Sequence, residues 1–174
     1  MKIIVTGGAG FIGSNFCRYI LEKYKNYKIY NLDKLSYAGN IDNLKDIEKK
    51  PNYKFYKIDI CDYKKLESVV KKIFPDVIIN FAAETHVDRS IIDPQMFIKT
   101  DILGTFNILE LARIYNIPRV IHISTDEVYG SIKKGSFTEK DKLEPTSPYS
   151  ASKASADLLI SSYIKTYNLP VIIV

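Results

Sequence analysis

Short apolar runs alternate with helically spaced segments along the whole sequence, and this alternation most strongly limits what the chain can fold into. Continuous apolar strands separated by helices are typical of a parallel sheet covered on both faces. Because the crossovers between such strands are right-handed, we expect an α/β fold with a doubly wound sheet. Apolar, β-branched runs predict strands at 2–6, 28–33, 54–60, 76–82, 119–125 and 170–174. Helical spacing predicts helices at 11–24, 63–74, 97–115 and 149–167.

A single domain accommodates all 174 residues, because a chain of this length buries a sizeable core. No linker, repeat or low-complexity tract divides it, so we expect residues 1–174 to form one domain. Two segments, 35–52 and 131–148, lack periodicity and are expected to be loops. Val174 falls inside the last apolar run, which would leave an unprotected sheet edge. We therefore expect part of a longer protein, whose sheet is cut in or after the sixth strand.

Composition and charge disfavour several other classes of protein. The sequence has no uninterrupted run of about 18 apolar residues that would predict a membrane helix. Its N-terminus lacks the features of a signal peptide. The net charge is +5, but the lysines are spread over amphipathic segments such as 63–74 and form no nucleic-acid-binding motif. We expect a cytoplasmic protein that binds neither nucleic acid nor a membrane.

The cysteines and histidines predict neither a disulfide nor a metal site. Cys17 lies in a helical segment and Cys61 follows a strand, a distribution that favours two reduced thiols. His86 and His122 have no ligand-like spacing to each other or to the cysteines. No metal is therefore expected.

The stretch TGGAGFIGS at 6–14 joins the first predicted strand to the first predicted helix. Gly7, Gly10 and Gly13 permit a tight turn, a close approach of the backbone to a pyrophosphate and close packing of the helix on the strand. The helix N-terminus behind them offers unpaired N–H groups and the positive end of its dipole to phosphates. These features predict a dinucleotide-binding site of the Rossmann kind.

Asp33 ends the second predicted strand, 20 residues after Gly13. A carboxylate at this place accepts hydrogen bonds from the hydroxyls of the adenosine ribose. A 2′-phosphate would meet its negative charge, so the sequence favours NAD over NADP as the cofactor.

The stretch YSASK at 149–153 places Tyr149 and Lys153 on one face of a predicted helix. A phenol has an ordinary pKa of about 10, and a nearby ammonium group favours the phenolate, which accepts a proton from a hydroxyl. Thr125, at the end of a predicted strand, is expected to hydrogen-bond the same hydroxyl. The three residues suit oxidation of a carbinol as a hydride leaves for a nicotinamide.

Asp126 and Glu127 follow Thr125 directly, in the stretch STDEVYG. Oxidation of a sugar hydroxyl does not need them, so they suit a second reaction, the elimination of water. Once C4 of a hexose is a ketone, one carboxylate can remove the C5 proton while a protonated one donates to the departing C6 hydroxyl. Adjacent carboxyls tend to have separated pKa values, which suits this division. Because successive strand residues face opposite sides of a sheet, both acids must lie beyond the strand to share a site.

The three-and-three glycine spacing, with Tyr149 and Lys153, resembles the extended short-chain dehydrogenase/reductases, which act largely on nucleotide sugars. Among them, STDEVYG, NLDKLSYAGN (31–40) and AAETHVDRS (82–90) are similar to the dTDP-glucose 4,6-dehydratase family. The resemblance spans the whole chain. It implies an NAD-dependent hydro-lyase of deoxysugar and rhamnose biosynthesis that converts dTDP-glucose to dTDP-4-keto-6-deoxyglucose.

The resemblance also implies roles for the residues that match the family's catalytic motifs. Asp126 would be the proton donor and Glu127 the proton acceptor of the elimination. Tyr149 would be the base of the oxidation. Thr125 would hold the sugar, and Lys153 would hold Tyr149 and the nicotinamide ribose.

The same resemblance implies contacts with NAD along the chain. Thr85 would touch the substrate as well as the cofactor. His86, Asp88 and Arg89 belong to the same signature stretch, and the sequence assigns them no role. Besides the three glycines, the implied NAD contacts are Phe11, Ile12, Asp33, Lys34, Leu35, Ser36, Asp59, Ile60, Phe81, Ala82, Ala83, Glu84, Thr85, Thr100, Tyr149 and Lys153.

Two features depart from that family. Asp101 stands where the family usually has Asn, which brings the local hydrogen bonding into question. Members also continue for a comparable length beyond Val174, and that part supplies most of the nucleotide-diphosphate pocket. By family habit, a homodimer would form through the helices at 97–115 and 149–167.

Three functions follow from these observations. The first is the dehydratase, in which NAD stays bound and no net NADH accumulates. The second is another nucleotide-sugar 4-epimerase or 4,6-dehydratase. The third is a catalytically silent NAD-binding module, because this sequence lacks a substrate-binding half.

Overall fold

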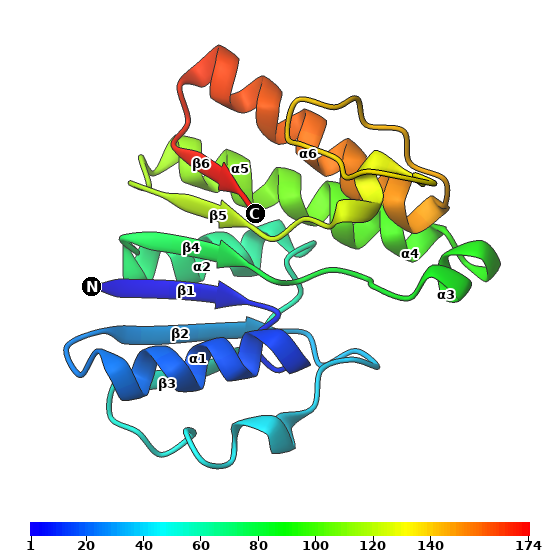
Figure 1. Ribbon diagram of the computed structural model, residues 1–174. Helices are drawn as coiled ribbons and strands as arrows, with labels where there is room; N and C mark the ends of the chain where they lie inside the picture. The colour runs from blue at the N-terminus through cyan, green and yellow to red at the C-terminus, as the bar shows by residue number, and fades with distance from the viewer.

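The computed structural model describes residues 1–174 and contains a sheet of six parallel strands (Figure 1). The strands lie in the order β3-β2-β1-β4-β5-β6. Between β1 and β4 the order reverses, and doubly wound folds bind ligands at such a point, beyond the carboxyl ends of the strands. The predicted α/β architecture is confirmed. The strands are β1 (Lys2–Thr6), β2 (Lys28–Asp33), β3 (Tyr53–Lys57), β4 (Val77–Asn80), β5 (Val120–His122) and β6 (Val171–Ile173).

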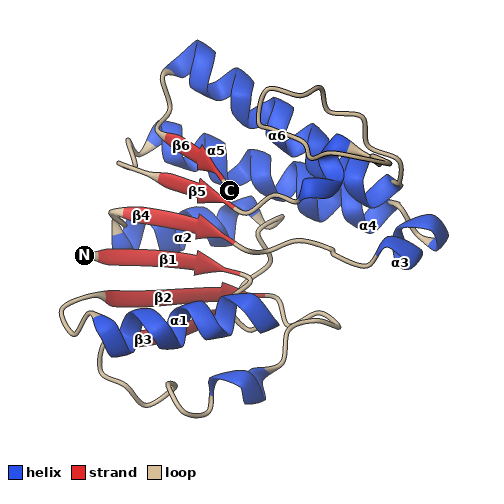
Figure 2. Cartoon of the chain, in the orientation of Figure 1, coloured by secondary structure: helices blue, strands red, loops and turns tan.

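Helices cover both faces of the sheet (Figure 2). Helix α1 packs on one face, and α2, α5 and α6 pack on the other. A π-helical turn at Ile98–Leu103 joins α4 to α5, and 3₁₀ turns occupy Ile41–Leu44 and Asp126–Tyr129. The helices are α1 (Phe11–Lys23), α2 (Tyr63–Ile73), α3 (Val87–Ile92), α4 (Gln95–Phe97), α5 (Gly104–Ile114) and α6 (Pro148–Tyr167).

The apolar runs of the central strands are explained by burial on both sides of the sheet. In β1, Ile4 packs into the core beneath α2, α5 and α6, whereas Ile3 and Val5 pack against α1. This division follows from the two-residue period of a strand. Ile4 and Val5 are completely buried, and each contributes about 1.5–3 kcal/mol of hydrophobic stabilisation.

The strand bounds differ from prediction where the chain turns toward functional loops. The strands predicted to end at residues 60, 82 and 125 end earlier, and their last residues belong to loops. Helix α3 is not predicted from the sequence, because its six residues show too short an apolar pattern. The helix predicted at 97–115 is divided by the π-helical turn, in which Thr100 and Asp101 are buried.

None of the helices is long and apolar enough to cross a membrane. Cys17 and Cys61 are both free, Cys17 buried in α1 and Cys61 partly buried after β3.

Candidate functional site

A cavity of about 500 Å³ lies where the strand order reverses, beyond the carboxyl ends of the central strands. It is walled by the loops that follow β1 to β5 and by two residues of α6. Leu35 and Glu84, both expected to touch the cofactor, do not line it, and neither do Asp126 and Glu127. The predicted residues that do line it are Gly7, Gly10, Phe11, Ile12, Gly13, Asp33, Lys34, Ser36, Asp59, Ile60, Phe81, Ala82, Ala83, Thr85, Thr100, Thr125, Tyr149 and Lys153.

The glycine loop forms a cradle at the start of α1. Gly7 has a φ of +72°, and a Cβ atom there would lie 2.5 Å from the backbone nitrogen of Ala82. Only glycine combines this conformation with such a close approach of two loops. Helix α1 begins after Gly10, and no side chain caps its N-terminal N–H groups. The uncapped N–H groups of this turn, beside the cavity, suit a phosphate.

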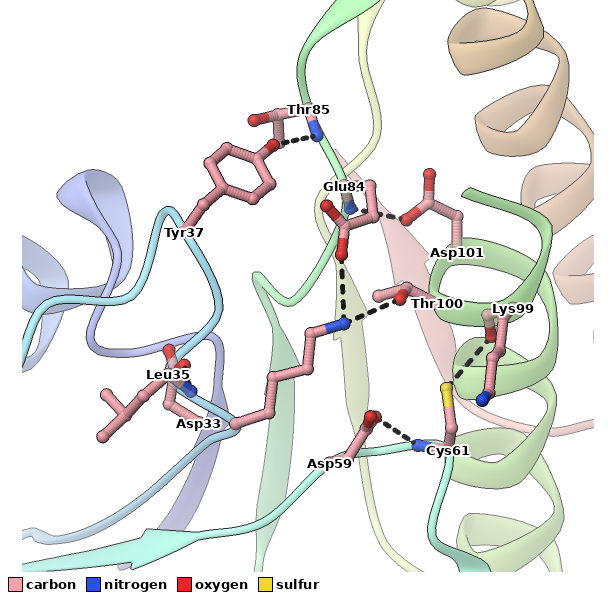
Figure 3. A network of polar contacts seen from close by, with 11 residues as sticks. Asp33, Leu35, Tyr37, Asp59, Cys61, Glu84, Thr85, Lys99, Thr100 and Asp101 are labelled. Atoms are coloured by element: carbon pink, nitrogen blue, oxygen red, sulfur yellow. Dashed lines mark hydrogen bonds and ion pairs between the residues drawn. The ribbon is translucent and has the colours of Figure 1, made fainter. Parts of the chain in front are cut away.

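The carboxylate of Asp33 is held in place by backbone N–H groups from two loops, one after β1 and one after β2. Its Oδ2 accepts a hydrogen bond from the Ala9 N–H at 2.9 Å, and its Oδ1 accepts one from the Leu35 N–H at 2.8 Å. A carboxylate has about four lone-pair directions, so acceptors remain for ribose hydroxyls. The residue is 8% exposed, which fixes its orientation. Leu35 donates this bond from a left-handed conformation (φ 58°), with its side chain turned away (Figure 3).

Six further residues line the cavity that sequence reasoning did not identify. Leu32 and Ile58 directly precede Asp33 and Asp59, two predicted NAD contacts. Their apolar side chains belong to the core, so the sequence indicates a packing role for them rather than a cofactor contact. Gly39 lies close to Asp33: a Cβ atom on it would lie 2.6 Å from Oδ1. Gly39, in the stretch YAGN, is therefore the sequence feature that indicates a close approach of this loop to Asp33. The six are Leu32, Ala38, Gly39, Ile58, Ile123 and Ser124.

Helix α6 brings Tyr149 and Lys153 to the cavity. Ser147 and Ser150 form a reciprocal capping box and Pro148 occupies the first turn, so the start of the helix is fixed. Both functional side chains are largely buried, at 8% and 3% exposed. The Lys153 Nζ donates to the Ile123 carbonyl at 2.6 Å and lies 3.4 Å from His122 Nε2.

Burial shifts the pKa values of this pair. Burial raises the pKa of Tyr149, and the nearby carboxylates of Asp126 and Glu127 add to the rise. Burial also lowers the pKa of Lys153. The role of Lys153 in favouring the phenolate stays a prediction. In the protein alone its ammonium group is itself desolvated and donates to the carbonyl of Ile123, the residue after β5. Among neighbouring groups, the hydroxyl of Thr125 acts to lower the Tyr149 pKa.

Asp126 and Glu127 lie beyond β5, in the 3₁₀ turn at Asp126–Tyr129. Thr125 caps this turn, since its hydroxyl accepts a hydrogen bond from the Glu127 N–H at 3.3 Å. Both acids are exposed, whereas Thr125 lines the cavity. The turn geometry meets the condition for a shared site, because the two side chains are no longer held on opposite faces of a strand. The turn packs against α6, so the acids and Tyr149 border the same region.

Asp101 connects α6 to the loop after β4, and Figure 3 shows its bond to Glu84 in that loop. Its Oδ1 accepts from the Glu84 N–H at 2.8 Å, and its Oδ2 accepts from the Ser152 hydroxyl at 2.7 Å. Ser152 lies in α6 next to Lys153. Asp101 is 1% exposed, and burial raises its pKa from 3.8 to about 6. The local hydrogen bonding, which the sequence left in question, is satisfied on both oxygens.

Replacing Asp101 with Asn is expected to stabilise the protein at neutral pH. The pKa of Asp101 is raised from 3.8 to about 6 on folding. The protonated carboxyl therefore makes its full contribution to the free energy of unfolding below pH 3.8, and this contribution is lost as the pH rises through about 6. This shift corresponds to about 2–3 kcal/mol at neutral pH. Asn keeps an acceptor for the Glu84 N–H and carries no charge to desolvate. Thermal or urea unfolding of Asp101→Asn should therefore show a gain of about 2 kcal/mol at pH 7.5 and almost none at pH 4.

Asp93→Asn is the matched control, because Asp93 is exposed and its substitution should change stability little at either pH. A destabilised Asp101→Asn variant at pH 7.5, or a gain of equal size at both pH values, would contradict the account of Asp101.

The chain was compared with known proteins. The family described as GDP-mannose 4,6 dehydratase matches residues 4–174. A dTDP-glucose 4,6-dehydratase of Salmonella typhimurium is 45% identical over 192 residues, which cover 99% of this chain and 53% of that protein. The chain thus spans about half the length of the curated relatives it matches.

Solved structures agree with this similarity. The dTDP-glucose 4,6-dehydratase from Bacillus anthracis, in complex with NAD, is 51% identical with a TM-score of 0.91, covering 99% of this chain and 53% of that one. The dTDP-glucose 4,6-dehydratase DesIV from Streptomyces venezuelae, also with NAD bound, is 46% identical with a TM-score of 0.94, covering 99% and 54%.

Proposed function

We propose, because the chain belongs to the GDP-mannose 4,6-dehydratase family, that the protein is an NAD-dependent dTDP-glucose 4,6-dehydratase. It removes water from dTDP-glucose and yields dTDP-4-keto-6-deoxyglucose, without net oxidation. The observation that carries this proposal is the acid pair Asp126–Glu127, set in a turn beside Tyr149 and the cavity. Relatives at 45–51% identity that are named for this activity support it.

The cofactor that we propose is NAD. The glycine cradle and the uncapped start of α1 suit its pyrophosphate, and the fixed carboxylate of Asp33 suits its adenosine ribose. When bound, NAD supplies a hydride acceptor for C4 and later a hydride donor for C6. It also brings a positive charge, which would lower the raised pKa of Tyr149.

Tyr149 accepts the proton of the C4 hydroxyl during oxidation. Thr125, whose hydroxyl opposes the rise in the Tyr149 pKa, hydrogen-bonds the same sugar oxygen. Lys153 is anchored on the Ile123 carbonyl, and from there it holds the nicotinamide ribose and the phenol in register. The buried neighbour His122 stays neutral, since burial and the charge of Lys153 lower its pKa to about 3.

The acid pair performs the elimination. Glu127 removes the C5 proton, which is acidified by the ketone at C4. Asp126, in its protonated form, donates to the C6 hydroxyl, which leaves as water. Because both side chains are exposed on a turn rather than fixed in a strand, they are free to approach opposite ends of the C5–C6 bond.

The product formed from dTDP-glucose and NAD tests the proposal. Mass spectrometry should show loss of one water, and absorbance at the NADH wavelength should not grow steadily. An isomer of unchanged mass would instead indicate a 4-epimerase, and steady NADH formation a dehydrogenase. Binding of NAD without any product would indicate that this chain is only a dinucleotide-binding module.

We also propose that the protein forms a homodimer through α5 and α6. Apolar side chains on these helices are exposed, among them Leu103 (44%), just before α5, Phe106 (38%) and Leu158 (62%). Sedimentation velocity tests this association, and a monomer at micromolar concentration would contradict it. The two free thiols support a reducing location, which we propose to be the cytoplasm.

A further inference from the structure

Two loops form opposite walls of the cavity. Ser36, Ala38 and Gly39 come from the loop after β2, and Ala83 and Thr85 come from the loop after β4. Strands β2 and β4 are not neighbours, because β1 lies between them. A contact between these loops therefore crosses over the carboxyl end of β1, where the glycine loop begins.

Tyr37 makes the first such contact (Figure 3). Its phenol oxygen accepts a hydrogen bond from the Thr85 N–H at 3.3 Å. The Arg89 guanidinium lies 3.9 Å from the centre of the Tyr37 ring, and the ring centres of Tyr37 and His86 are 5.7 Å apart. The aromatic ring from one wall is thus held by the start of α3 on the other wall. This contact gives His86 and Arg89, which had no role from the sequence, a place in the site.

Lys34 makes the second contact between the two walls. Its Nζ lies 3.0 Å from Glu84 Oε1 and donates to the Thr100 hydroxyl at 3.0 Å. The Glu84 carboxylate is 5% exposed, so this ion pair is largely shielded from water. Burial is the largest single influence and acts to lower the pKa of Lys34, but the hydrogen bond and charge of Glu84, with the nearby charge of Asp59, together raise this pKa. The second contact therefore joins the two walls through a buried carboxylate and a lysine.

We infer that the two contacts, made by Lys34 and Tyr37 with Glu84, Thr85 and Arg89, form a clasp that controls entry and release of the dinucleotide. This inference rests on the proposed function, in which the cavity binds NAD. Both contacts run from one wall of the cavity to the other, so we expect a dinucleotide to enter or leave when they open. The clasp thereby retains the cofactor through a reaction that returns it to its starting oxidation state.

Tyr37 and Glu84 are suitable for testing the clasp because neither residue lines the cavity. A residue that only touches the dinucleotide affects release and leaves entry unchanged. A residue of the clasp slows both steps, so its removal should accelerate both. Stopped-flow fluorescence measures the rate at which NADH binds to this chain. The rate of NADH release is measured by displacing bound NADH with excess NAD.

Tyr37→Ala is expected to raise the rate constant of NADH release about tenfold, as loss of one cation–π contact and one hydrogen bond implies. Entry should also accelerate several-fold, so the dissociation constant should change less than the release rate. Glu84→Gln, which keeps the shape of the side chain and removes the ion pair, should change both rates in the same directions. Circular dichroism establishes that each variant is folded.

Tyr167→Ala is the matched control. Tyr167 is similarly exposed (51%, against 45% for Tyr37) and also has an arginine, Arg113, over its ring at 5.1 Å. It does not line the cavity, so both rates should match those of the wild type. Unchanged rates in Tyr37→Ala and Glu84→Gln, or faster release with unchanged entry, would overturn the clasp. Absence of NADH binding to the wild-type chain would instead overturn the proposed cofactor, and with it the proposed function.

Discussion

Glu127→Gln is expected to slow formation of the 4-keto-6-deoxy product by about 10²–10⁴-fold, the contribution typical of general acid–base catalysis. The amide cannot accept the C5 proton, whereas its size matches that of the carboxyl. Glu127 is exposed and lies on the 3₁₀ turn that Thr125 caps through the Glu127 N–H. The substitution keeps that backbone bond, so the turn should stay intact.

The spectroscopic signature of Glu127→Gln is as informative as its rate. Tyr149 and Lys153 are unaltered, so oxidation at C4 should proceed while the elimination is blocked. NADH absorbance should therefore rise by up to one equivalent and persist, instead of remaining near zero as in the wild type. Glu139→Gln, an exposed acid in the loop before α6, is the control and should behave as the wild type. Product formation within about threefold of the wild type would assign proton abstraction to another group.

Tyr149→Phe is expected to reduce turnover by a similar factor of about 10²–10⁴, but at an earlier step. Without the phenol, no group accepts the C4 hydroxyl proton, so no NADH should form even in a single turnover. NAD binding should be retained, because the ring still fills its place against Phe97. The two variants are thus distinguished by whether bound NADH appears.

The raised pKa of Tyr149 also fixes the direction of the pH dependence. The phenol must lose its proton to act as a base, so turnover should increase with pH on the alkaline side of neutrality. Tyr163→Phe is the control, since Tyr163 lies on the same helix, is buried and donates to Glu110 at 2.7 Å, away from the cavity. A Tyr149→Phe variant that still forms NADH, or a rate that falls as the pH rises from 7 to 9, would contradict the proposed role.

The residues whose environment is local were well predicted from the sequence. Strands β1 and β2 have their predicted bounds. Both are apolar strands inside the sheet; Gly7 follows the end of β1, and Asp33 is the last residue of β2. The glycine loop and the turn that holds Asp126 and Glu127 follow from short-range backbone requirements. These depend on a few neighbouring residues, which the sequence displays directly.

The remaining features depend on contacts between distant segments. Glu84 was expected at the cofactor, but its side chain turns to Lys34, fifty residues earlier in the chain. Asp101 was identified as unusual, yet its partner Ser152 is 51 residues away. The direction of the Tyr149 pKa also depends on burial, which spacing alone does not reveal. Such pairings arise when the loops after different strands meet at one edge of the sheet.

The most direct test of the account uses dTDP-glucose that carries deuterium at C4, incubated with the protein and NAD. Because the hydride removed from C4 is returned to C6, mass spectrometry and NMR should show loss of one water with the deuterium retained in the C6 methyl group. A product of unchanged mass, or deuterium lost from the sugar into accumulating NADH, would contradict the proposed dehydratase.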